Sequence, residues 1–375
     1  MCFSHLRWDF VFQRPQHLLT RCAEKRRVFF VEEPTFSEDP PRMEIESRSP
    51  GVHRVVPCLP AGLDDAQQHS VLSRLVGEMF RRCAVDDYVL WYYTPMAIPF
   101  TRHLMPRAIV YDCMDELSAF AGAPPALCGY EAELFRRAHL VLTGGHSLFE
   151  AKQHKHPNIH PVPSSVDVAH FEKARSRVSD PVDQEGIPHP RLGFFGVLDE
   201  RFDAALIDQI AAARPDLHIV LIGPVVKIDP NSLPRRPNIH YLGKKAYTDL
   251  PAYVGGWDVA LLPFARNDAT RFISPTKTPE YLAAGRPVVS TSIRDVVRPY
   301  GELGLVRIAD TAEETIAAVD TCLADERGPL GDSRRKARLA RVDTFLSEMS
   351  WDGTWAKVDA LLTAATRPPL ARRAH

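Results

Sequence analysis

Residues 267–291 read NDATRFISPTKTPEYLAAGRPVVST, and the order of residue types predicts a loop, a short helix and a buried strand. The first half is polar and interrupted by proline, which favours a loop. Thr278 is suited to cap a helix, and the helix is expected over residues 280–284 because Gly285 follows it as a C-terminal cap. The β-branched run at 287–291 predicts a buried strand. The stretch therefore brings a loop directly to a helix N-terminus.

Two side chains near that N-terminus indicate what it could bind. Unpaired backbone N–H groups and a partial positive charge allow a diphosphate to be held there, and Lys277 adds a full charge. The carboxylate of Glu280 suits the paired hydroxyls of a ribose. The simpler interpretation is that Lys277 is solvated and that Glu280 only favours the helix dipole. From these residues alone, both interpretations stay open.

The chain as a whole predicts an α/β protein of two domains. At 375 residues it is too long for one ordinary core, and apolar runs that read as strands alternate with helical segments. This alternation is typical of doubly wound, mostly parallel sheets. The expected limits are 1–171 for the first domain, 172–190 for a linker, 191–349 for the second domain, 350–365 for a terminal helix and 366–375 for a disordered tail.

Charge and cysteine content restrict the partners and the compartment. Lys+Arg 46 against Asp+Glu 47 gives a net charge of -1, so no overall field favours nucleic acid. Seven scattered cysteines without a CxxC pair are typical of reduced thiols in the cytosol and imply no zinc site. No signal peptide is visible, and no stretch reaches the roughly 20 apolar residues of a membrane helix. We therefore expect a cytoplasmic protein, peripheral to a membrane at most.

One basic segment could make such a peripheral contact. Residues 334–341 read RRKARLAR and predict a helix. Its charged side chains either form a solvated face or contact anionic lipid headgroups. The sequence leaves both options open.

Carboxylates follow one predicted strand of the first domain. Asp112 and Asp115 come at the end of the apolar run that starts at Ala108, and ligands of doubly wound sheets lie beyond the carboxyl ends of strands. Either carboxylate could accept a proton from an acceptor hydroxyl. Alternatively, either could cap the next element. His146 follows the next predicted strand and is expected to face the same cleft.

Two motifs resemble a known family. PEYLAAGRPVV at 279–289 resembles the nucleotide-sugar motif of GT-B-fold glycosyltransferases, above all glycosyltransferase family four. WDFVFQRPQHL at 8–18 resembles the start of bacterial cell-surface polysaccharide enzymes of this type. The resemblance implies the GT-B fold, in which two Rossmann-like doubly wound domains face each other across a cleft. It also implies that the helix at 350–365 packs back on the first domain. Similar chains begin several residues earlier, so we expect the first strand to be incomplete.

The resemblance assigns a donor site to the second domain. Glu280 would hold the donor ribose. Gly196 and Arg201 would meet the diphosphate, although the Lys that follows Arg in the family pattern is absent and Lys277 is expected to replace its charge. Gly223 lies where relatives hold the base.

The sugar-contacting part of the motif departs from the family. Relatives often carry a second Glu that touches the donor sugar, and this chain has Phe272 there. Ser274, Thr276 and Lys277 are the candidate substitutes. In the first domain, Arg14 and His17 lie in the motif that would offer the first strand-to-helix loop to the acceptor.

The combined prediction is a glycosyltransferase that moves a sugar from a nucleoside-diphosphate sugar to a saccharide or lipid-linked acceptor in cell-envelope or exopolysaccharide biosynthesis. Retention of anomeric configuration is expected, as in the relatives, and the scheme needs no metal or other cofactor. One alternative is a nucleotide-sugar epimerase on the same fold. Another is a non-catalytic sugar- or nucleotide-binding partner, which Phe272 and the incomplete phosphate motif would suit.

Overall fold

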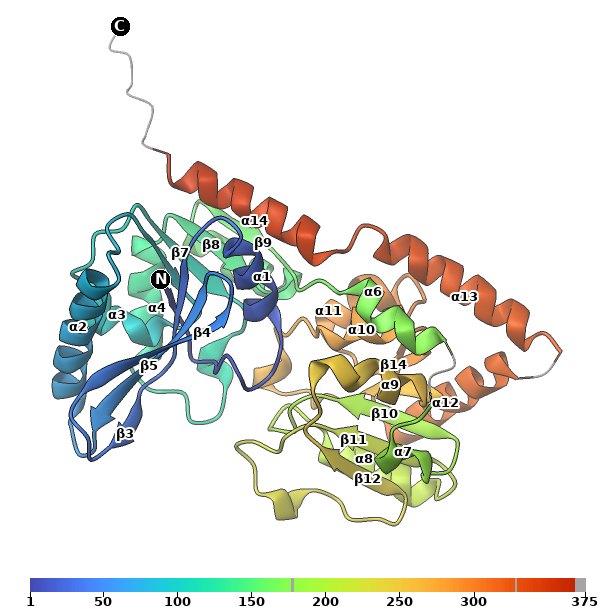
Figure 1. Ribbon diagram of the computed structural model, residues 1–375. Coiled ribbons are helices and arrows are strands. Elements are labelled where there is room, and N and C mark those ends of the chain that lie inside the picture. The colour runs from blue at the N-terminus through green and yellow to red at the C-terminus, as the bar shows by residue number, and fades with distance from the viewer. Residues whose placement is uncertain (177–178, 328, 368–375) are drawn as a thin grey trace, which may run out of the picture. The chain divides into compact units, whose positions relative to one another are not determined.

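The protein consists of two compact units, as seen in a computed structural model that describes residues 1–176, 179–327 and 329–367 (Figure 1). Unit 1 comprises Met1–Ser118, Gly122–Pro163 and the chain from Asp352 onward. Unit 2 comprises Ser164–Trp351 together with Ala119–Ala121. Each unit is a Rossmann-like α/β structure built on its own, mostly parallel sheet.

The sheet of unit 1 has nine strands, eight of them in the order β3-β5-β2-β1-β6-β7-β8-β9 with parallel neighbours. β4 pairs with β5 in antiparallel fashion. The central strands are short apolar runs, buried on both faces. The strands are β1 (Cys2–Phe3), β2 (Val28–Val31), β3 (Thr35–Ser37), β4 (Arg42–Ser49), β5 (Val52–Pro60), β6 (Val89–Tyr92), β7 (Ala108–Cys113), β8 (Leu140–Thr143) and β9 (Ile159–Pro161).

Helices cover this sheet and include the last one of the chain. They are α1 (Arg14–Cys22), α2 (Asp65–Arg82), α3 (Ile98–Thr101), α4 (Leu127–Arg137), α5 (His146–Lys152) and α14 (Trp351–Ala365). α14 is attached to unit 1 by ion pairs to the end of α1 and the segment after it: Arg21 to Asp352 at 2.6 Å, and Arg26 to Asp359 at 2.8 Å. These two ion pairs hold the terminal helix on unit 1.

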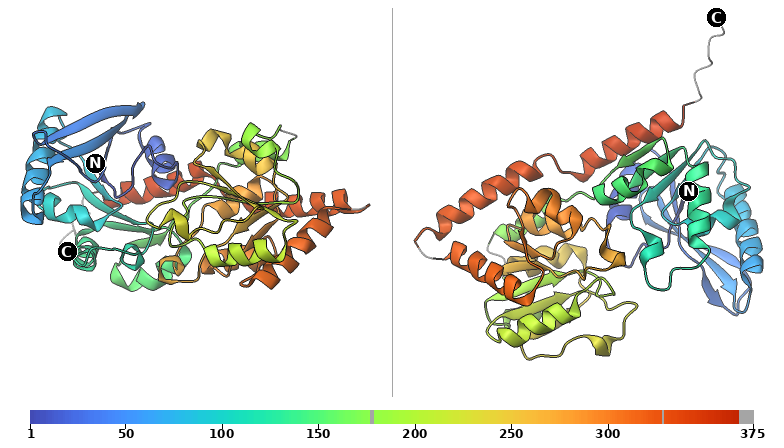
Figure 2. Two further views of the ribbon diagram at one scale, coloured as in Figure 1. Left: turned by 90° about the horizontal axis from the view of Figure 1, so that it is seen from below. Right: turned by 180° about the vertical axis from the view of Figure 1, so that it is seen from behind.

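The sheet of unit 2 has six strands in the order β12-β11-β10-β13-β14-β15, all parallel. The chain starts in the middle at β10, moves outward on one side and then crosses to the other. Consequently α8 and α12 pack together on one face, and α9 and α10 lie on the other (Figures 1 and 2). The strands are β10 (Arg191–Phe195), β11 (His218–Ile222), β12 (Ile239–Gly243), β13 (Val259–Leu262), β14 (Val288–Ser290) and β15 (Arg307–Ile308).

The helices of unit 2 include two short ones before the first strand. They are α6 (Val168–Phe171), α7 (Val182–Glu185), α8 (Ala204–Ala213), α9 (Leu250–Gly255), α10 (Lys277–Ala283), α11 (Arg294–Val296), α12 (Ala312–Glu326) and α13 (Gly331–Leu346). The predicted linker at 172–190 is therefore wrong as a separate element. α7 lies within it, and its Gln184 is fully buried and donates to the Tyr253 carbonyl at 3.0 Å. The predicted tail falls mostly on residues 368–375, which lie outside the described residues.

The basic segment at 334–341 is part of α13. Arg338 pairs with Glu326 at 2.7 Å, Arg334 contacts Asp325 at 3.5 Å, and Arg341 donates to the Leu303 carbonyl at 2.5 Å. These contacts within unit 2 favour the interpretation of a helix with a solvated, ion-paired face. Across the described residues, no helix is long and apolar enough to span a membrane.

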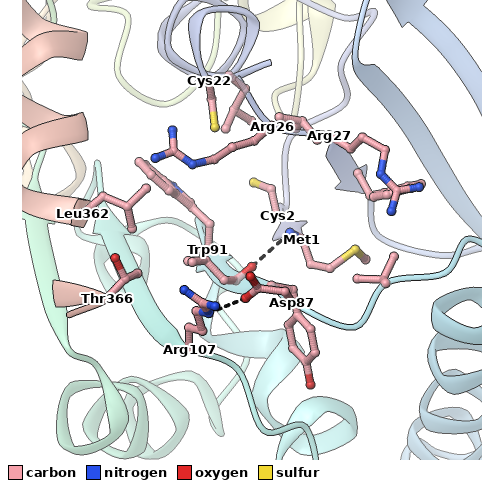
Figure 3. A pocket seen from close by; sticks show the side chains of 16 residues that line it. Met1, Cys2, Cys22, Arg26, Arg27, Asp87, Trp91, Arg107, Leu362 and Thr366 are labelled. Carbon is pink, nitrogen blue, oxygen red and sulfur yellow. Dashed lines mark hydrogen bonds and ion pairs between the residues drawn. The ribbon is translucent and has the colours of Figure 1, made fainter. Parts of the chain in front are cut away.

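Unit 1 also contains a pocket of about 370 Å³, at the amino ends of β1, β2 and β6 (Figure 3). Cys22, Arg26 and Trp91 line it, together with Leu362 and Thr366 from the end of the chain. Ligands of open α/β sheets bind at the opposite, carboxyl edge. The pocket is therefore separate from the site predicted by the sequence.

Candidate functional site

The strand order of unit 2 places its candidate site between β10 and β13. The chain reverses its direction of winding between these two strands, and ligands of open α/β sheets bind at the carboxyl edge of such a point. β10 and β13 pair only at Leu192–Val259 and Gly193–Ala260, so they separate towards that edge. Gly196 directly follows β10 and lies where the two strands diverge.

Two glycines form the floor of this site. Gly196 has φ +154° and Gly223 has φ +146°, a backbone region that other residues rarely adopt. A Cβ atom on Gly223 would overlap the carbonyl oxygen of Gly196, and a Cβ on Gly196 would lie 2.5 Å from Cε of Lys277. The Lys277 side chain thus crosses directly over the Gly196 backbone. The structure brings together Gly196 and Lys277, which were predicted on the phosphate side, and Gly223, which was predicted on the base side.

The helix that follows begins earlier than the sequence predicts. α10 starts at Lys277, so Thr278 does not cap it and lies inside the first turn. The Thr278 N–H donates to the Pro275 carbonyl at 3.2 Å, and Pro279 has no N–H to offer. The helix N-terminus therefore supplies fewer free donors than expected. The positive charge of this site rests mainly on the Lys277 side chain.

Glu280 lies one turn further along α10 and is 8% exposed. Burial raises the pKa of its carboxyl group to about 8, against the opposing effect of Lys277. A buried carboxylate gains from hydrogen-bond donors, and the two hydroxyls of a ribose would provide them. The geometry therefore fits the predicted role of Glu280 on a ribose.

Arg201 is less available than the sequence predicts. Its guanidinium donates three hydrogen bonds to the Asp199 carboxylate, at 2.6, 3.0 and 3.2 Å, and lies 5.4 Å from the ring centroid of Phe120. A diphosphate would have to compete with Asp199 for it. Ser274 and Thr276 were predicted to replace the Glu that contacts the donor sugar in relatives. Both are half-buried in the loop before α10.

In unit 1, Arg14 and Asp112 form one buried ion pair. The Arg14 guanidinium donates to the Asp112 carboxylate at 2.9 and 3.2 Å and to the Val162 carbonyl at 2.5 Å. Both side chains are at most 1% exposed. An enclosed carboxylate already neutralised by arginine is poorly suited to take a proton from a substrate. This arrangement favours a structural role for Asp112 and Arg14 over the predicted catalytic and acceptor-side roles.

The other candidates of unit 1 follow strand ends at the same carboxyl edge. Asp115 is half-buried in the loop after β7, and His146 is exposed at the start of α5. His17 is buried on α1, with its ring 4.7 Å from that of Phe12 in an edge-on arrangement. Of the two predicted carboxylates, Asp115 is therefore the more accessible one.

A buried charge network that the sequence analysis did not predict lies next to the Asp115 loop. Lys152 Nζ forms ion pairs with Glu116 at 2.8 Å and with Glu131 at 2.7 Å. The Tyr111 hydroxyl donates a hydrogen bond to Glu131 at 2.8 Å. The charges keep the pKa of Lys152 above its usual value despite its burial. These residues are spread over about 40 positions and carry no motif, so only the fold reveals them.

Comparison with known proteins supports the prediction that unit 2 is a glycosyltransferase domain. Residues 189–325, which hold β10 to α12, match the family model described as glycosyl transferases group 1. A Bacillus subtilis protein, TuaH, provisionally named a teichuronic acid biosynthesis glycosyltransferase, is 24% identical over 239 residues. That match covers 59% of this chain and 60% of the relative, so the chain matches less than two thirds of the relative's length.

Solved structures share the fold over nearly the whole chain. A UDP-forming α,α-trehalose-phosphate synthase from Burkholderia xenovorans has a TM-score of 0.67 at 13% identity, covering 98% of this chain and 99% of its own. Sucrose-phosphate synthase from Thermosynechococcus elongatus gives 0.67 at 14%, covering 93% and 91%. Anabaena HepE, solved with UDP and glucose, gives 0.66 at 14%, covering 97% and 98%.

The fold is therefore GT-B, as predicted, and residues 189–325 of unit 2 are similar to the family of glycosyl transferases group 1.

Proposed function

We propose that this protein transfers a sugar from a nucleoside-diphosphate sugar to a saccharide or lipid-linked acceptor. The setting we propose is cell-envelope or exopolysaccharide biosynthesis on the cytoplasmic side of the membrane. The group 1 family match and the similarity to TuaH support this proposal. The observation that carries it is the arrangement of Gly196, Lys277 and Glu280 at the edge where β10 and β13 part.

This arrangement suits two parts of such a donor, the diphosphate and the nucleoside. The side-chain-free backbone at Gly196 lets a diphosphate approach closely, and Lys277 neutralises its charge. The charge on the diphosphate grows as the glycosidic bond breaks, so a fixed cation there stabilises the transition state more than the bound substrate. Glu280 accepts hydrogen bonds from the ribose and thereby fixes the nucleoside end.

On the acceptor side, we propose Asp115 as the group that assists deprotonation of the acceptor hydroxyl. Asp112 and Arg14 then serve as a rigid support at the end of β7. We keep retention of configuration as part of the proposal. A metal ion has no assigned role in it, because Lys277 supplies the cation.

A second candidate is a partner protein that binds a nucleotide sugar without turning it over. The engagement of Arg201 with Asp199 favours it, since a phosphate-side arginine is then occupied. This protein would bind the same ligands but release no nucleoside diphosphate.

Thermal stability against UDP, GDP, ADP and TDP and their sugars tests the proposal, with Glu280→Ala as the site variant. A ligand at a hundred times its dissociation constant adds about 2.7 kcal/mol to the free energy of unfolding. We expect one base to stabilise the wild type and to stabilise the variant much less. The nucleotide sugar with the selected base is then incubated with the protein. Release of the nucleoside diphosphate distinguishes an enzyme from a non-catalytic binding protein. Stabilisation by none of the ligands would overturn the assignment of the donor site.

The ribose contact has its own control. The 2′-deoxy form of the selected nucleotide lacks one of the two hydroxyls that Glu280 would bind. Wild-type protein should prefer the ribonucleotide by about tenfold, and Glu280→Gln should lose most of that preference. An unchanged preference in the variant would show that Glu280 does not hold the ribose.

A further inference from the structure

One hydroxyl group joins the two halves of the proposed donor site. The N–H of Phe195, the last residue of β10, donates to the Tyr281 hydroxyl at 2.8 Å, and that hydroxyl lies 3.4 Å from the Phe195 carbonyl oxygen. Tyr281 is completely buried and follows Glu280 on α10. The side chain thus connects the helix that carries Lys277 and Glu280 to the strand that leads into Gly196.

The backbone of β10 needs an acceptor at this point. Successive N–H groups of a strand point to opposite neighbours, and the Gly196 N–H donates to the Ile222 carbonyl on β11 at 2.8 Å. The Phe195 N–H therefore points towards β13. Pairing with β13 has already ended at Gly193 and Ala260, so the strand offers no partner. The Tyr281 hydroxyl supplies the acceptor that the sheet lacks.

An indole ring packs on β10 and against the ring of Tyr281. Trp257 lies against Gly193 so closely that a Cβ on that glycine would overlap the ring. Its Nε1 donates to Gln184 at 3.0 Å, which fixes the ring, and the Tyr281 ring meets it edge-on at 5.8 Å between centroids. The position of the Tyr281 hydroxyl is therefore set by rigid neighbours.

We infer that Tyr281 is a positioning residue of the donor site, an inference that rests on the proposed function. By holding the end of β10 to α10, its hydroxyl sets the spacing between the Gly196 backbone and the Lys277 side chain. A diphosphate bound between them depends on that spacing. The nucleoside part, held at Glu280 on the helix itself, depends on it much less.

The test compares Tyr281→Phe with Tyr253→Phe, which removes a hydroxyl that donates to Asp183 at 2.8 Å elsewhere in unit 2. Dissociation constants are measured for UDP and UMP, or for the same pair with the base that the stability panel selects. Tyr281→Phe should weaken diphosphate binding about tenfold and monophosphate binding less than about threefold. Tyr253→Phe should change neither. Equal weakening of both nucleotides, or none, by Tyr281→Phe would overturn the inference and leave the donor site standing.

A measurement on the wild type covers the case in which Tyr281→Phe does not fold. Hydrogen exchange is followed for the peptide that contains Phe195 and for the peptide that contains α10, with and without the same diphosphate. Both should become slower together, because the hydroxyl couples them. Slowing in α10 alone would contradict the coupling. If the wild type binds no nucleotide at all, the proposed function fails, and the inference fails with it.

Discussion

Arg14 and Asp112, 98 positions apart in the sequence, form an ion pair that is almost wholly closed to solvent. It joins the first residue of α1 to the end of β7, at the edge of unit 1 where an acceptor would bind. Charge and geometry are both satisfied within the pair, since Arg14 also bonds to the Val162 carbonyl. The two residues are therefore better understood as one structural unit than as separate reactive groups.

Removing one member of this pair should destabilise the protein strongly. Asp112→Asn and Arg14→Met each leave one buried charge uncompensated, and we expect a loss of about 3–5 kcal/mol in the free energy of unfolding. The double variant should lose clearly less than the sum. Denaturant unfolding measures all three. Additive losses would show that the charges do not depend on each other.

Adding a methyl group at Gly196 should damage the donor site specifically. The new Cβ would displace Lys277, so Gly196→Ala should weaken binding of the nucleoside diphosphate by about tenfold or more. Gly243→Ala is the matched control, because Gly243 also has a positive φ, +69°, but no atom within 4 Å of the added Cβ. Titration calorimetry compares the two variants. Equal effects would point to backbone strain and not to Lys277.

Nucleotide binding should depend on pH through Glu280. In the free protein its pKa is about 8, so the carboxyl group is mostly protonated at pH 6. Hydrogen bonds from a ribose favour the ionised form and lower this pKa, so affinity should rise with pH up to about 8 and then level off, by at most about tenfold per pH unit. Glu280→Gln should remove that part of the dependence. An identical profile in the variant would assign the dependence to the phosphates.

Asp115 is expected to affect turnover more than binding. Asp115→Asn should lower kcat by about a hundredfold or more while leaving the dissociation constant of the donor within a factor of about three. Asp112→Asn is not a suitable comparison because of its structural pair. Glu150→Gln, on the exposed side of α5, serves as the control and should leave kcat unchanged. Normal turnover in Asp115→Asn would exclude it as the base.

The fold was largely predictable from local patterns. Apolar runs such as Val28–Val31 and Val259–Leu262 are buried strands, and the alternation with helices led to the parallel sheets that the structure contains. The candidate donor residues Lys277 and Glu280 come from one contiguous stretch of sequence, and their role in binding the donor stays a prediction. The match of residues 189–325 to a family model reflects that same continuity.

The rest depends on contacts that no local pattern encodes. The start of α10 at Lys277 follows from the bond between Thr278 and Pro275, which competes with the predicted cap. Arg201 is paired with Asp199, two residues earlier. This pairing depends on the side-chain rotamer of Arg201, which cannot be predicted from the sequence. Tyr281 and Phe195 are 86 positions apart, and their hydrogen bond exists only because β10 and β13 separate.

The division of unit 1 between the two ends of the chain has a consequence for biosynthesis. The chain from Asp352 onward belongs to unit 1, and almost all of unit 2 is encoded between it and Pro163. At a synthesis rate of roughly 5–20 residues per second, unit 1 lacks its last helix for some tens of seconds while unit 2 is being synthesised. Unit 2 can complete its fold before unit 1 does. A premature stop codon at Asp352 would therefore remove part of unit 1 and leave unit 2 complete.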